Sequence, residues 1–244
     1  MCDTCGCGDT RIVPVDVEAR LLDLNDRTAA HNRAHFRRRG VAAINLMGSP
    51  GAGKTAILEA TARGLAGRRR LAAVTGDLET ERDADRLRGA GINATAITTG
   101  SACHLDAEMV HEALHSGISD AVDYLFIENV GNLVCPAIYD LGQAVNVVAL
   151  SVTEGEDKPL KYPVMFRAAD LVLLTKIDLL AALPDYDRSA VYAALARVMP
   201  APRVLEVSAR TGSGIDAWFA WIGQLRIAKA TADGRQPHVK GEAL

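Results

Sequence analysis

Residues 48–55, GSPGAGKT, decide the fold of this chain. They follow the apolar run 41–47 and precede a segment with helical composition, which is the order that a phosphate-binding loop requires. Gly48, Gly51 and Gly53 allow a tight turn whose backbone N–H groups can face an anion at the start of a helix. The loop therefore predicts a nucleoside triphosphate site.

Two side chains of the loop have the chemistry that such a site needs. Lys54 would neutralise the terminal phosphates, and the Thr55 hydroxyl would complete the coordination shell of Mg²⁺. The other loop positions expected to touch the nucleotide are Gly48, Ser49, Gly51, Ala52, Gly53 and Ala56. A glycine-rich turn that matches by chance is the weaker interpretation, because every fixed position is satisfied between a strand and a helix.

Composition limits the classes of protein. The 244 residues are 49% hydrophobic, which suits one α/β domain with short appendages. A net charge of -3 gives no basic field for nucleic acid. No apolar run approaches the roughly twenty residues of a membrane span, and the start MCDTCGCGDT lacks the apolar core of a signal peptide. We therefore expect a cytoplasmic protein, in which an odd number of cysteines, 5, favours metal or thiol chemistry over disulfides.

Apolar strand-like runs recur along the chain and alternate with helix-like segments. This alternation predicts an α/β fold, with a mostly parallel sheet covered by helices on both faces. The expected strands are 41–47, 71–75, 92–98, 122–127, 145–152, 171–174 and 203–207, after a helix at 16–39. The expected domains are a flexible, cysteine-containing metal-binding tail at 1–14, a P-loop nucleotide-binding domain with an N-terminal helix at 15–228, and a C-terminal tail at 229–244.

The segment LLTKIDLL, residues 173–180, indicates which base is bound. The Asp178 carboxylate can accept hydrogen bonds from N1–H and the exocyclic amine of guanine, a donor pair that adenine lacks. Lys176 can lie across the purine, and Ser208 with Ala209 can supply a backbone contact to the guanine oxygen. The usual guanine motif begins with asparagine, so Thr175 in that place predicts a weaker side-chain tether.

Two acidic segments are expected to serve magnesium and the hydrolytic water. In GDLETERDAD, residues 76–85, Asp77 ends a strand and is the natural magnesium or water partner. In IENVGN, residues 127–132, Glu128 can reach magnesium through water and Gly131 can donate its N–H to the terminal phosphate. Lys54, Thr55, Asp77 and Glu128 are thus the predicted catalytic residues. Glu81 and Asp83 are open candidates for positioning water.

Cysteine and histidine form two candidate metal sites. One candidate site consists of Cys103, His104 and Cys135, which fall beside the segment IENVGN that is predicted to contact the terminal phosphate. Two thiolates with an imidazole suit zinc or nickel. They supply only three ligands, which leaves one position open or filled by a second chain. In the tail, the spacing CDTCGC places Cys2, Cys5 and Cys7 together. If Met1 is removed, the backbone amine of Cys2 joins the three thiols. This set of four ligands could wrap nickel in a square-planar arrangement.

At these residues the chain resembles the hydrogenase nickel incorporation GTPase family, HypB, a SIMIBI-like group of P-loop GTPases. The resemblance covers nearly the whole chain and is carried, in order, by CxxCGC, GSPGAGKT, GDLETERDADR, TGSACHLDA, IENVGNLVCP, GEDKPLKYP and TKID. It implies a slow GTPase that forms a homodimer with GTP and helps deliver nickel to the large subunit of [NiFe] hydrogenase, together with a HypA-like accessory metallochaperone.

The resemblance also implies roles for individual residues. Cys2, Cys5 and Cys7 would form the tight nickel site. Cys103, His104 and Cys135 would form the site of the nucleotide domain, where two protomers meet, for nickel or zinc. Lys158 would reach toward the guanine across the dimer. The 6 histidines are scattered along the sequence rather than gathered in a histidine-rich stretch, so nickel storage is not expected.

Three alternatives remain at this point. A urease accessory GTPase also handles nickel, but the cysteine tail and the adjacent Cys103 and His104 disfavour it. A small-molecule kinase would use the same phosphate-binding loop and give Asp178 no guanine to recognise. A metal buffer, in which nucleotide only regulates metal binding, predicts no GTP turnover.

Overall fold

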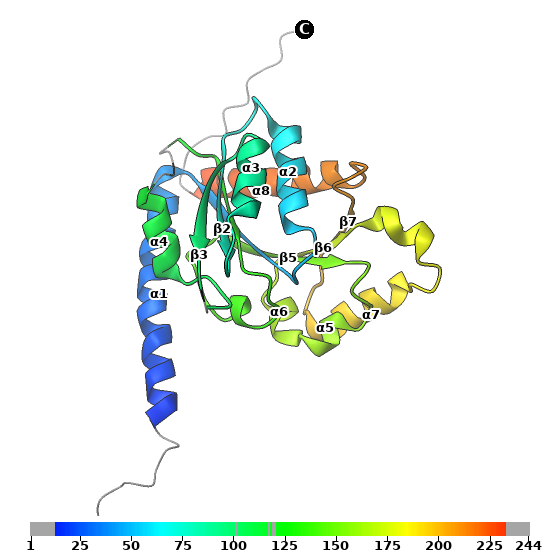
Figure 1. Cartoon of the computed structure of the whole chain (residues 1–244), viewed down its shortest axis with the longest axis horizontal. Coiled ribbons are helices and arrows are strands. Elements are labelled where there is room, and N and C mark those ends of the chain that lie inside the picture. The colour runs from blue at the N-terminus through cyan, green and yellow to red at the C-terminus, as the bar shows by residue number, and fades with distance from the viewer. Residues whose placement is uncertain (1–12, 101, 117, 119–120, 233–244) are drawn as a thin grey trace, which may run out of the picture.

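The computed structural model describes residues 13–100, 102–116, 118 and 121–232. Its centre is a seven-stranded sheet in which every pairing is parallel, in the order β3-β2-β4-β1-β5-β6-β7 (Figure 1). The strands are β1 (Ala42–Met47), β2 (Leu71–Asp77), β3 (Asn93–Thr98), β4 (Tyr124–Glu128), β5 (Val145–Ser151), β6 (Leu171–Thr175) and β7 (Val204–Val207). The predicted parallel α/β fold is confirmed, and each predicted strand lies within about two residues of an observed one.

Helices cover both faces of the sheet. They are α1 (Val13–Arg39), α2 (Lys54–Leu65), α3 (Arg82–Gly89), α4 (Ala107–Ser116), α5 (Lys158–Lys161), α6 (Pro163–Arg167), α7 (Arg188–Val198) and α8 (Ile215–Ala232), with 3-10 turns η1 (Cys135–Ala137) and η2 (Ile177–Ala182). Helices α2, α3 and α8 pack on one face, whereas α1, α4, α6 and α7 pack on the other. None of the described helices has the length and apolar character that crossing a membrane requires.

The strand alternation explains this layering. Along β1, Ala42, Ile44 and Leu46 join the core under α2 and α8, while Ala43 faces the core under α1 and α4. Because both faces are covered, nearly all of β1 is apolar, which is the pattern of a buried parallel strand.

The terminal helices extend beyond the predicted domain limits. Helix α1 begins at Val13, and Pro14 is compatible with a first turn because proline lacks an N–H that would have no intrahelical partner there. Helix α8 continues to Ala232 through alanine and lysine, which are good helix formers without apolar periodicity. The limits at 14 and 228 therefore fall inside helices, and residues 1–12 and 233–244 lie outside the described part.

The topology collects the functional loops at one edge. In a parallel sheet, ligands bind beyond the carboxyl ends of the strands, near the point where the strand order reverses. Strand β1 lies between β4 and β5, so the loop after β1 has the loop after β4 as its neighbour. The loops after β2, β6 and β7 end at the same edge and complete the candidate site.

Candidate functional site

The phosphate-binding loop places the start of α2 at the centre of the site. Gly48 has φ 145°, and a Cβ there would lie 2.4 Å from the carbonyl oxygen of Ala149. The loop can therefore approach β5 only with glycine at this position. Gly53, with φ 94°, precedes α2, and no described side chain caps the first-turn N–H groups. These amides are free to bind an anion.

Lys54 lies inside the loop rather than in solvent. It is 7% exposed, and its Nζ donates to the carbonyl oxygens of Gly48 at 3.1 Å and Ser49 at 3.2 Å. Burial lowers the pKa of Lys54, while Glu128 and Asp83 oppose that effect. The ammonium is thus held beside the helix start, where terminal phosphates would sit.

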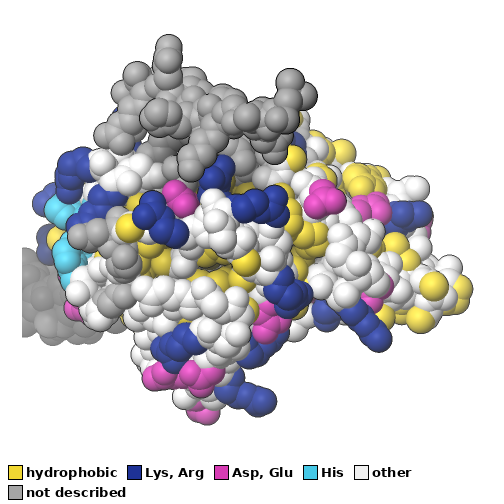
Figure 2. Space-filling model, turned by 90° about the horizontal axis from the view of Figure 1, so that it is seen from above, with side chains coloured by type: hydrophobic (Ala, Val, Ile, Leu, Met, Phe, Trp, Pro, Cys, Tyr) yellow, Lys and Arg dark blue, Asp and Glu magenta, His cyan; other side chains and the backbone are white. Residues whose placement is uncertain are grey.

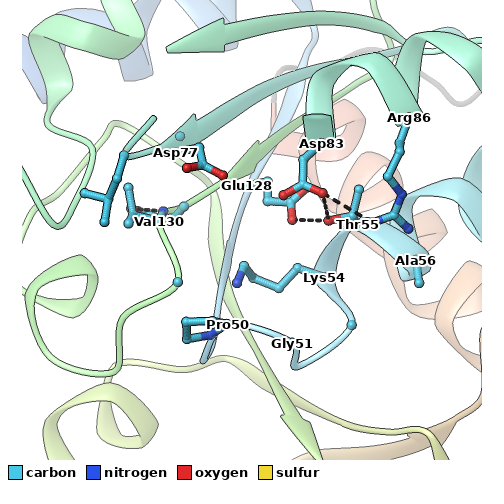
Figure 3. Close-up of a pocket in the computed structure, with 15 residues that line it drawn as sticks. Pro50, Gly51, Lys54, Thr55, Ala56, Asp77, Asp83, Arg86, Glu128 and Val130 are labelled. Carbon is cyan, nitrogen blue, oxygen red and sulfur yellow. Dashed lines mark hydrogen bonds and ion pairs between the residues drawn. The ribbon is translucent and has the colours of Figure 1, made fainter. Parts of the chain in front are cut away.

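Three oxygen-bearing side chains meet at the start of α2. Thr55 Oγ1 lies 2.7 Å from Glu128 Oε1 and 3.0 Å from Asp83 Oδ1, as the dashed lines of Figure 3 show. Glu128 is 3% exposed and comes from β4, while Asp83 comes from the first turn of α3. Burial raises the pKa of Glu128 to about 7, although Thr55 and Lys54 act in the opposite direction.

This cluster fits a magnesium ion. Oε2 of Glu128 is buried and has no hydrogen-bond partner among the described residues. A buried carboxylate oxygen without a partner is costly, and a hard cation that prefers oxygen ligands would satisfy it. Thr55 and Glu128 are the residues that would hold Mg²⁺, with Asp83 beside them.

The predicted magnesium partner Asp77 lies at the end of β2 and lines the same cavity, which has a volume of about 450 Å³. Its carboxylate accepts hydrogen bonds from the Glu79 N–H at 3.1 Å and the Thr80 hydroxyl at 3.3 Å. Of the two open candidates for positioning water, Asp83 enters the site. Glu81 is exposed and pairs with Arg88.

The loop after β4 lines the cavity through Val130 and Gly131. A Cβ on Gly131 would lie 2.9 Å from the backbone nitrogen of Pro50, so only glycine allows this approach. Asn132 forms an isolated β-bridge with Gly48. Gly131 therefore lies against the phosphate-binding loop, in the region where its predicted contact with the terminal phosphate would form.

A second cavity, of about 250 Å³, lies next to Gly53 and Ala56. The predicted base-recognition residues Thr175, Lys176, Asp178 and Ala209 line it. Because it lies beside the phosphate-binding loop, where the predicted base would be bound, we call this cavity the purine pocket.

The side chains of this purine pocket are fixed by hydrogen bonds. Asp178 Oδ1 accepts a hydrogen bond from the Ser208 hydroxyl at 2.6 Å, which orients the carboxylate. Thr175 Oγ1 donates to the carbonyl oxygen of Ala52 at 2.6 Å. The threonine in the asparagine position thus has a direct tether to the phosphate-binding loop, and whether it is weaker than that of an asparagine stays a prediction.

Lys158 does not line the purine pocket of its own chain. It begins α5, and its Nζ lies 5.3 Å from the centre of the Tyr162 ring. The expected contact across a dimer remains a prediction.

The structure brings Cys103, His104 and Cys135 together. Their ligand atoms all lie within 4.8 Å of one another, with the two sulfurs 3.0 Å apart. The His104 ring stacks on Tyr139 at 3.9 Å, and burial lowers the pKa of His104. The hydrogen bond to Cys103 raises the pKa of Cys135. Two sulfurs and an imidazole suit nickel or zinc, with a fourth position free.

The predicted tail site, Cys2, Cys5 and Cys7, lies outside the described residues. Among the residues of the nucleotide cavity that the sequence reasoning missed are Arg86 and Asn129. Arg86 binds Glu59 through two hydrogen bonds of 3.0 Å and reaches Asp83 at 3.2 Å. The sequence feature that could have identified Arg86 is its position three residues after Asp83, because residues three apart share a helix face.

Comparisons with known proteins show which family this chain resembles. Residues 42–202 match the family model described as CobW/HypB/UreG, nucleotide-binding domain. The hydrogenase maturation factor HypB of Rhizobium leguminosarum bv. viciae is 51% identical over 217 residues, covering 89% of this chain and 72% of the relative.

Two solved structures share the fold at substantial identity. The hydrogenase maturation factor HypB from Archaeoglobus fulgidus is 38% identical with a TM-score of 0.77, over 84% of this chain and 100% of that one. HypB from Helicobacter pylori, solved in complex with nickel, is 37% identical with a TM-score of 0.76, over 89% of this chain and 99% of that one.

Proposed function

The chain belongs to the HypB family of hydrogenase maturation factors, and from that premise we propose that it is a GTP-hydrolysing nickel metallochaperone. It would help insert nickel into the large subunit of [NiFe] hydrogenase. Metal binding would depend on the bound nucleotide and on dimerisation. Nickel is therefore a cargo of the protein, and GTP is its substrate.

One observation carries this proposal: the cluster Cys103, His104 and Cys135 lies beside the loop after β4, which lines the nucleotide cavity. Cys135 follows Asn132 by three residues, and Asn132 bridges to Gly48 of the phosphate-binding loop. A nucleotide that orders this loop would move the segment that carries a metal ligand. By linkage, metal would change nucleotide affinity by the same coupling free energy, typically ~1–3 kcal/mol.

The side chains support hydrolysis by positioning and charge rather than by a covalent nucleophile. Lys54 and the free amides of α2 would bind the terminal phosphates. Mg²⁺, when held by Thr55 and Glu128, would neutralise charge between the phosphates. Asp77 and Asp83 are the carboxylates available to orient water. The oriented Asp178 carboxylate supports guanine specificity and disfavours the kinase alternative.

Exposed apolar residues beside the metal cluster support a homodimer. Val134 and Ile138, which flank η1, are 45% and 48% exposed, and Val164 on the adjoining α6 is 49% exposed. Exposed apolar groups of this kind mark contact surfaces. A second copy meeting this surface would also bring further ligands to the incomplete metal site and place Lys158 near the partner's guanine.

The partners that follow from this role are the hydrogenase large subunit and a HypA-like metallochaperone. We place the protein in the cytoplasm, where GTP is present and thiol ligands stay reduced. The overall charge of -3 gives no reason to propose a nucleic-acid partner.

The test is nickel stoichiometry and affinity of the full chain beside a triple Cys2→Ala, Cys5→Ala, Cys7→Ala variant. Each protein is titrated with GDP and with a non-hydrolysable GTP analogue, and GTP turnover is measured in parallel. We expect a tight site that is lost in the variant and a weaker site that responds to nucleotide.

Each part of the proposal has its own contrary outcome. Equal nickel affinity in the variant and the intact chain would rule out a nickel site at Cys2, Cys5 and Cys7. Equal nickel affinity with GDP and with the GTP analogue would rule out coupling between metal binding and the bound nucleotide. Absence of GTP turnover in the presence of Mg²⁺ would leave a metal buffer that is only regulated by nucleotide.

A further inference from the structure

Histidines that are scattered in the sequence gather in the structure. Four of the 6 histidines lie where α1 and α4 pack against each other, side by side in Figure 1. Histidine side chains also gather at one edge of the surface in Figure 2, beside lysine or arginine. We propose that His31, His111 and His115 form a further metal site, for a divalent transition-metal ion, with His35 adjacent.

Helical spacing explains why these rings share one surface. His31 and His35 are four residues apart on α1, and His111 and His115 are four residues apart on α4, so each pair lies on one face of its helix. Rings also meet across the helices: His31 lies against His111, and His35 lies against His115. The cluster therefore joins two helices that are distant in sequence.

The distances between the rings suit a shared ion. The ring centres of His31 and His111 are 5.1 Å apart, and those of His111 and His115 are 4.6 Å apart. A metal bonded to imidazole nitrogen at about 2.0–2.1 Å brings two neighbouring rings to roughly 4.5–5.5 Å between centres. His35 lies farther away, 6.2 Å from His115, which is why we place it beside the site rather than in it.

A buried amide already orients the central histidine. Asn32 is 0% exposed, and its Nδ2 donates to the carbonyl oxygens of Ala107 at 2.8 Å and Leu141 at 3.3 Å. Carbonyl oxygens only accept, so these bonds fix the orientation of the amide and make its Oδ1 the atom that faces His111 Nδ1 at 3.1 Å. His111 must therefore donate through Nδ1.

This hydrogen bond leaves Nε2 of neutral His111 with a free lone pair. Metal-binding histidines almost always donate their other ring nitrogen to a fixed acceptor, which sets the tautomer and the ring orientation. Asn32 supplies that acceptor here.

The outer histidines have room to turn toward an ion. His31 and His115 are exposed, and their rings meet His111 edge to face. Of the described residues, only the Cys103 cluster already has three ligand atoms within 4.8 Å, so metal binding here requires rotation of these rings. Exposed side chains make such rotations readily.

The ligand set selects the class of metal. Imidazole nitrogens suit Ni²⁺, Cu²⁺ and Zn²⁺, whereas Mg²⁺ and Ca²⁺ prefer oxygen. The site contains no thiol, so it is separable by chemistry from Cys103 and Cys135. The inference is also independent of nickel delivery, because it rests only on the packing of α1 and α4.

The test uses the full chain with all cysteines blocked by N-ethylmaleimide and the nucleotide cavity filled with GDP and Mg²⁺. Titration with Ni²⁺, and separately with Zn²⁺, is followed by isothermal calorimetry. We expect one ion per chain. His31→Gln should weaken its affinity at least 10-fold, and the double variant His31→Gln, His115→Gln should abolish the site.

Two matched variants control for non-specific binding by histidine. His104→Gln alters the other cluster, and His238→Gln alters a histidine outside the described residues; both should retain the ion. His31 and His115 are exposed, so their substitution should leave the fold largely undisturbed. Thermal unfolding of each variant checks this. X-ray absorption of the bound nickel should show nitrogen ligands and no sulfur.

Three results would overturn the proposal. Blocked wild-type protein that binds no ion has no such site. Equal loss in His31→Gln and His238→Gln would indicate scattered surface binding. Unchanged affinity in His31→Gln, with loss of the site in the double variant, would mean that α4 binds metal alone and that the site does not join the helices.

Discussion

The side-chain Oδ1 of Asn129 accepts a hydrogen bond from the backbone N–H of Leu105 at 3.0 Å. Asn129 follows Glu128 in the loop that lines the nucleotide cavity, and Leu105 follows His104 in the metal cluster. Both residues are buried. One hydrogen bond thus joins the side chain of the residue after Glu128 to the backbone of the residue after His104.

Asn129→Ala should reduce the dependence of metal affinity on nucleotide. The substitution leaves the buried Leu105 N–H without its acceptor. The segment that carries His104 is then no longer coupled to the loop after β4. We expect the ratio of nickel affinities with GDP and with a GTP analogue to move toward one. The protein should also lose about 1–3 kcal/mol of unfolding free energy, which denaturant titration measures.

Asn146→Ala is the matched control. Asn129 donates to Asn45 Oδ1 at 3.2 Å, and Asn45 in turn donates to Asn146 Oδ1 at 3.0 Å, so Asn146 belongs to the same chain of amides. The acceptor of the Leu105 N–H, however, is Asn129 and not Asn146. The control variant should lose stability and keep the nucleotide dependence. Equal loss of coupling in both variants would show that Asn129 acts through general destabilisation.

Glu128 should make the metal-free, nucleotide-free protein less stable as the pH rises from about 4.5 to 7. Its pKa is about 7 in the fold against an ordinary 4.5, so the folded state holds the proton more tightly than the unfolded state in this interval. Stability falls wherever the folded state binds more protons. The loss should be roughly 2–4 kcal/mol and should level off above pH 7.

Glu128→Gln removes this titration. Urea unfolding in EDTA at a series of pH values should show a flatter profile for the variant than for the wild type. The same slope in both proteins would mean that another group dominates the interval. GTP turnover should also fall in the variant, because the buried oxygen that fits Mg²⁺ is replaced by an amide.

Asp178→Asn should weaken GTP binding by about 100-fold or more and improve binding of xanthosine triphosphate. Asparagine keeps one oxygen that can accept from guanine N1–H, but its amide NH2 faces the exocyclic amine of guanine, so one charge-assisted hydrogen bond worth about 1.5–3 kcal/mol is lost and two donors meet. Xanthine has an oxygen where guanine has its amine, so the asparagine amide can donate to it. Competition binding with both nucleotides measures the change.

Ser208→Ala tests the orientation of Asp178 separately. The hydroxyl holds the carboxylate at 2.6 Å, so its loss should weaken GTP binding about 10-fold without changing the preferred base. A change in base preference in this variant, or none in Asp178→Asn, would contradict the assignment of the purine pocket.

The fold could be predicted because local signals agree with the topology. Continuous apolar strands such as β1 and β5 occur only where helices cover both faces of a sheet, and the glycines of the phosphate-binding loop mark the strand-to-helix turn. The ends of the helices were harder to predict from the sequence. Helix α8 continues through residues that have good helix propensity and no apolar period, so pattern alone placed its end too early.

The site was predictable where a residue acts through its type and position in a motif. Lys54, Thr55 and Asp178 belong to this class. Arg86 and Asn129 do not, because their importance comes from partners far away in sequence, Glu59 and Leu105. The pairing of His31 with His111 has the same origin. It depends on how α1 packs against α4, which spacing along one helix does not reveal.

Arg86 should contribute to GTP turnover by positioning Asp83. Its guanidinium is held by Glu59 at 3.0 Å, and the remaining nitrogen donates to Asp83 Oδ1, which also faces Thr55. Arg86→Ala frees the Asp83 carboxylate beside Thr55 and Glu128, the residues that would hold Mg²⁺. We expect kcat to fall about 10-fold, in the range of one lost positioning contact, and the Mg²⁺ concentration for half-maximal turnover to rise.

Arg88→Ala on the same helix is the control for charge and for helix stability. Arg88 pairs with Glu81 and Asp85 at the surface, where ion pairs contribute little, so turnover and Mg²⁺ dependence should stay near wild type. Arg86→Lys keeps the charge but loses the planar two-bond contact with Glu59, and it should recover only part of the activity. If Arg86→Ala lowers thermal stability with unchanged kcat and Mg²⁺ dependence, the residue only holds α3 against α2.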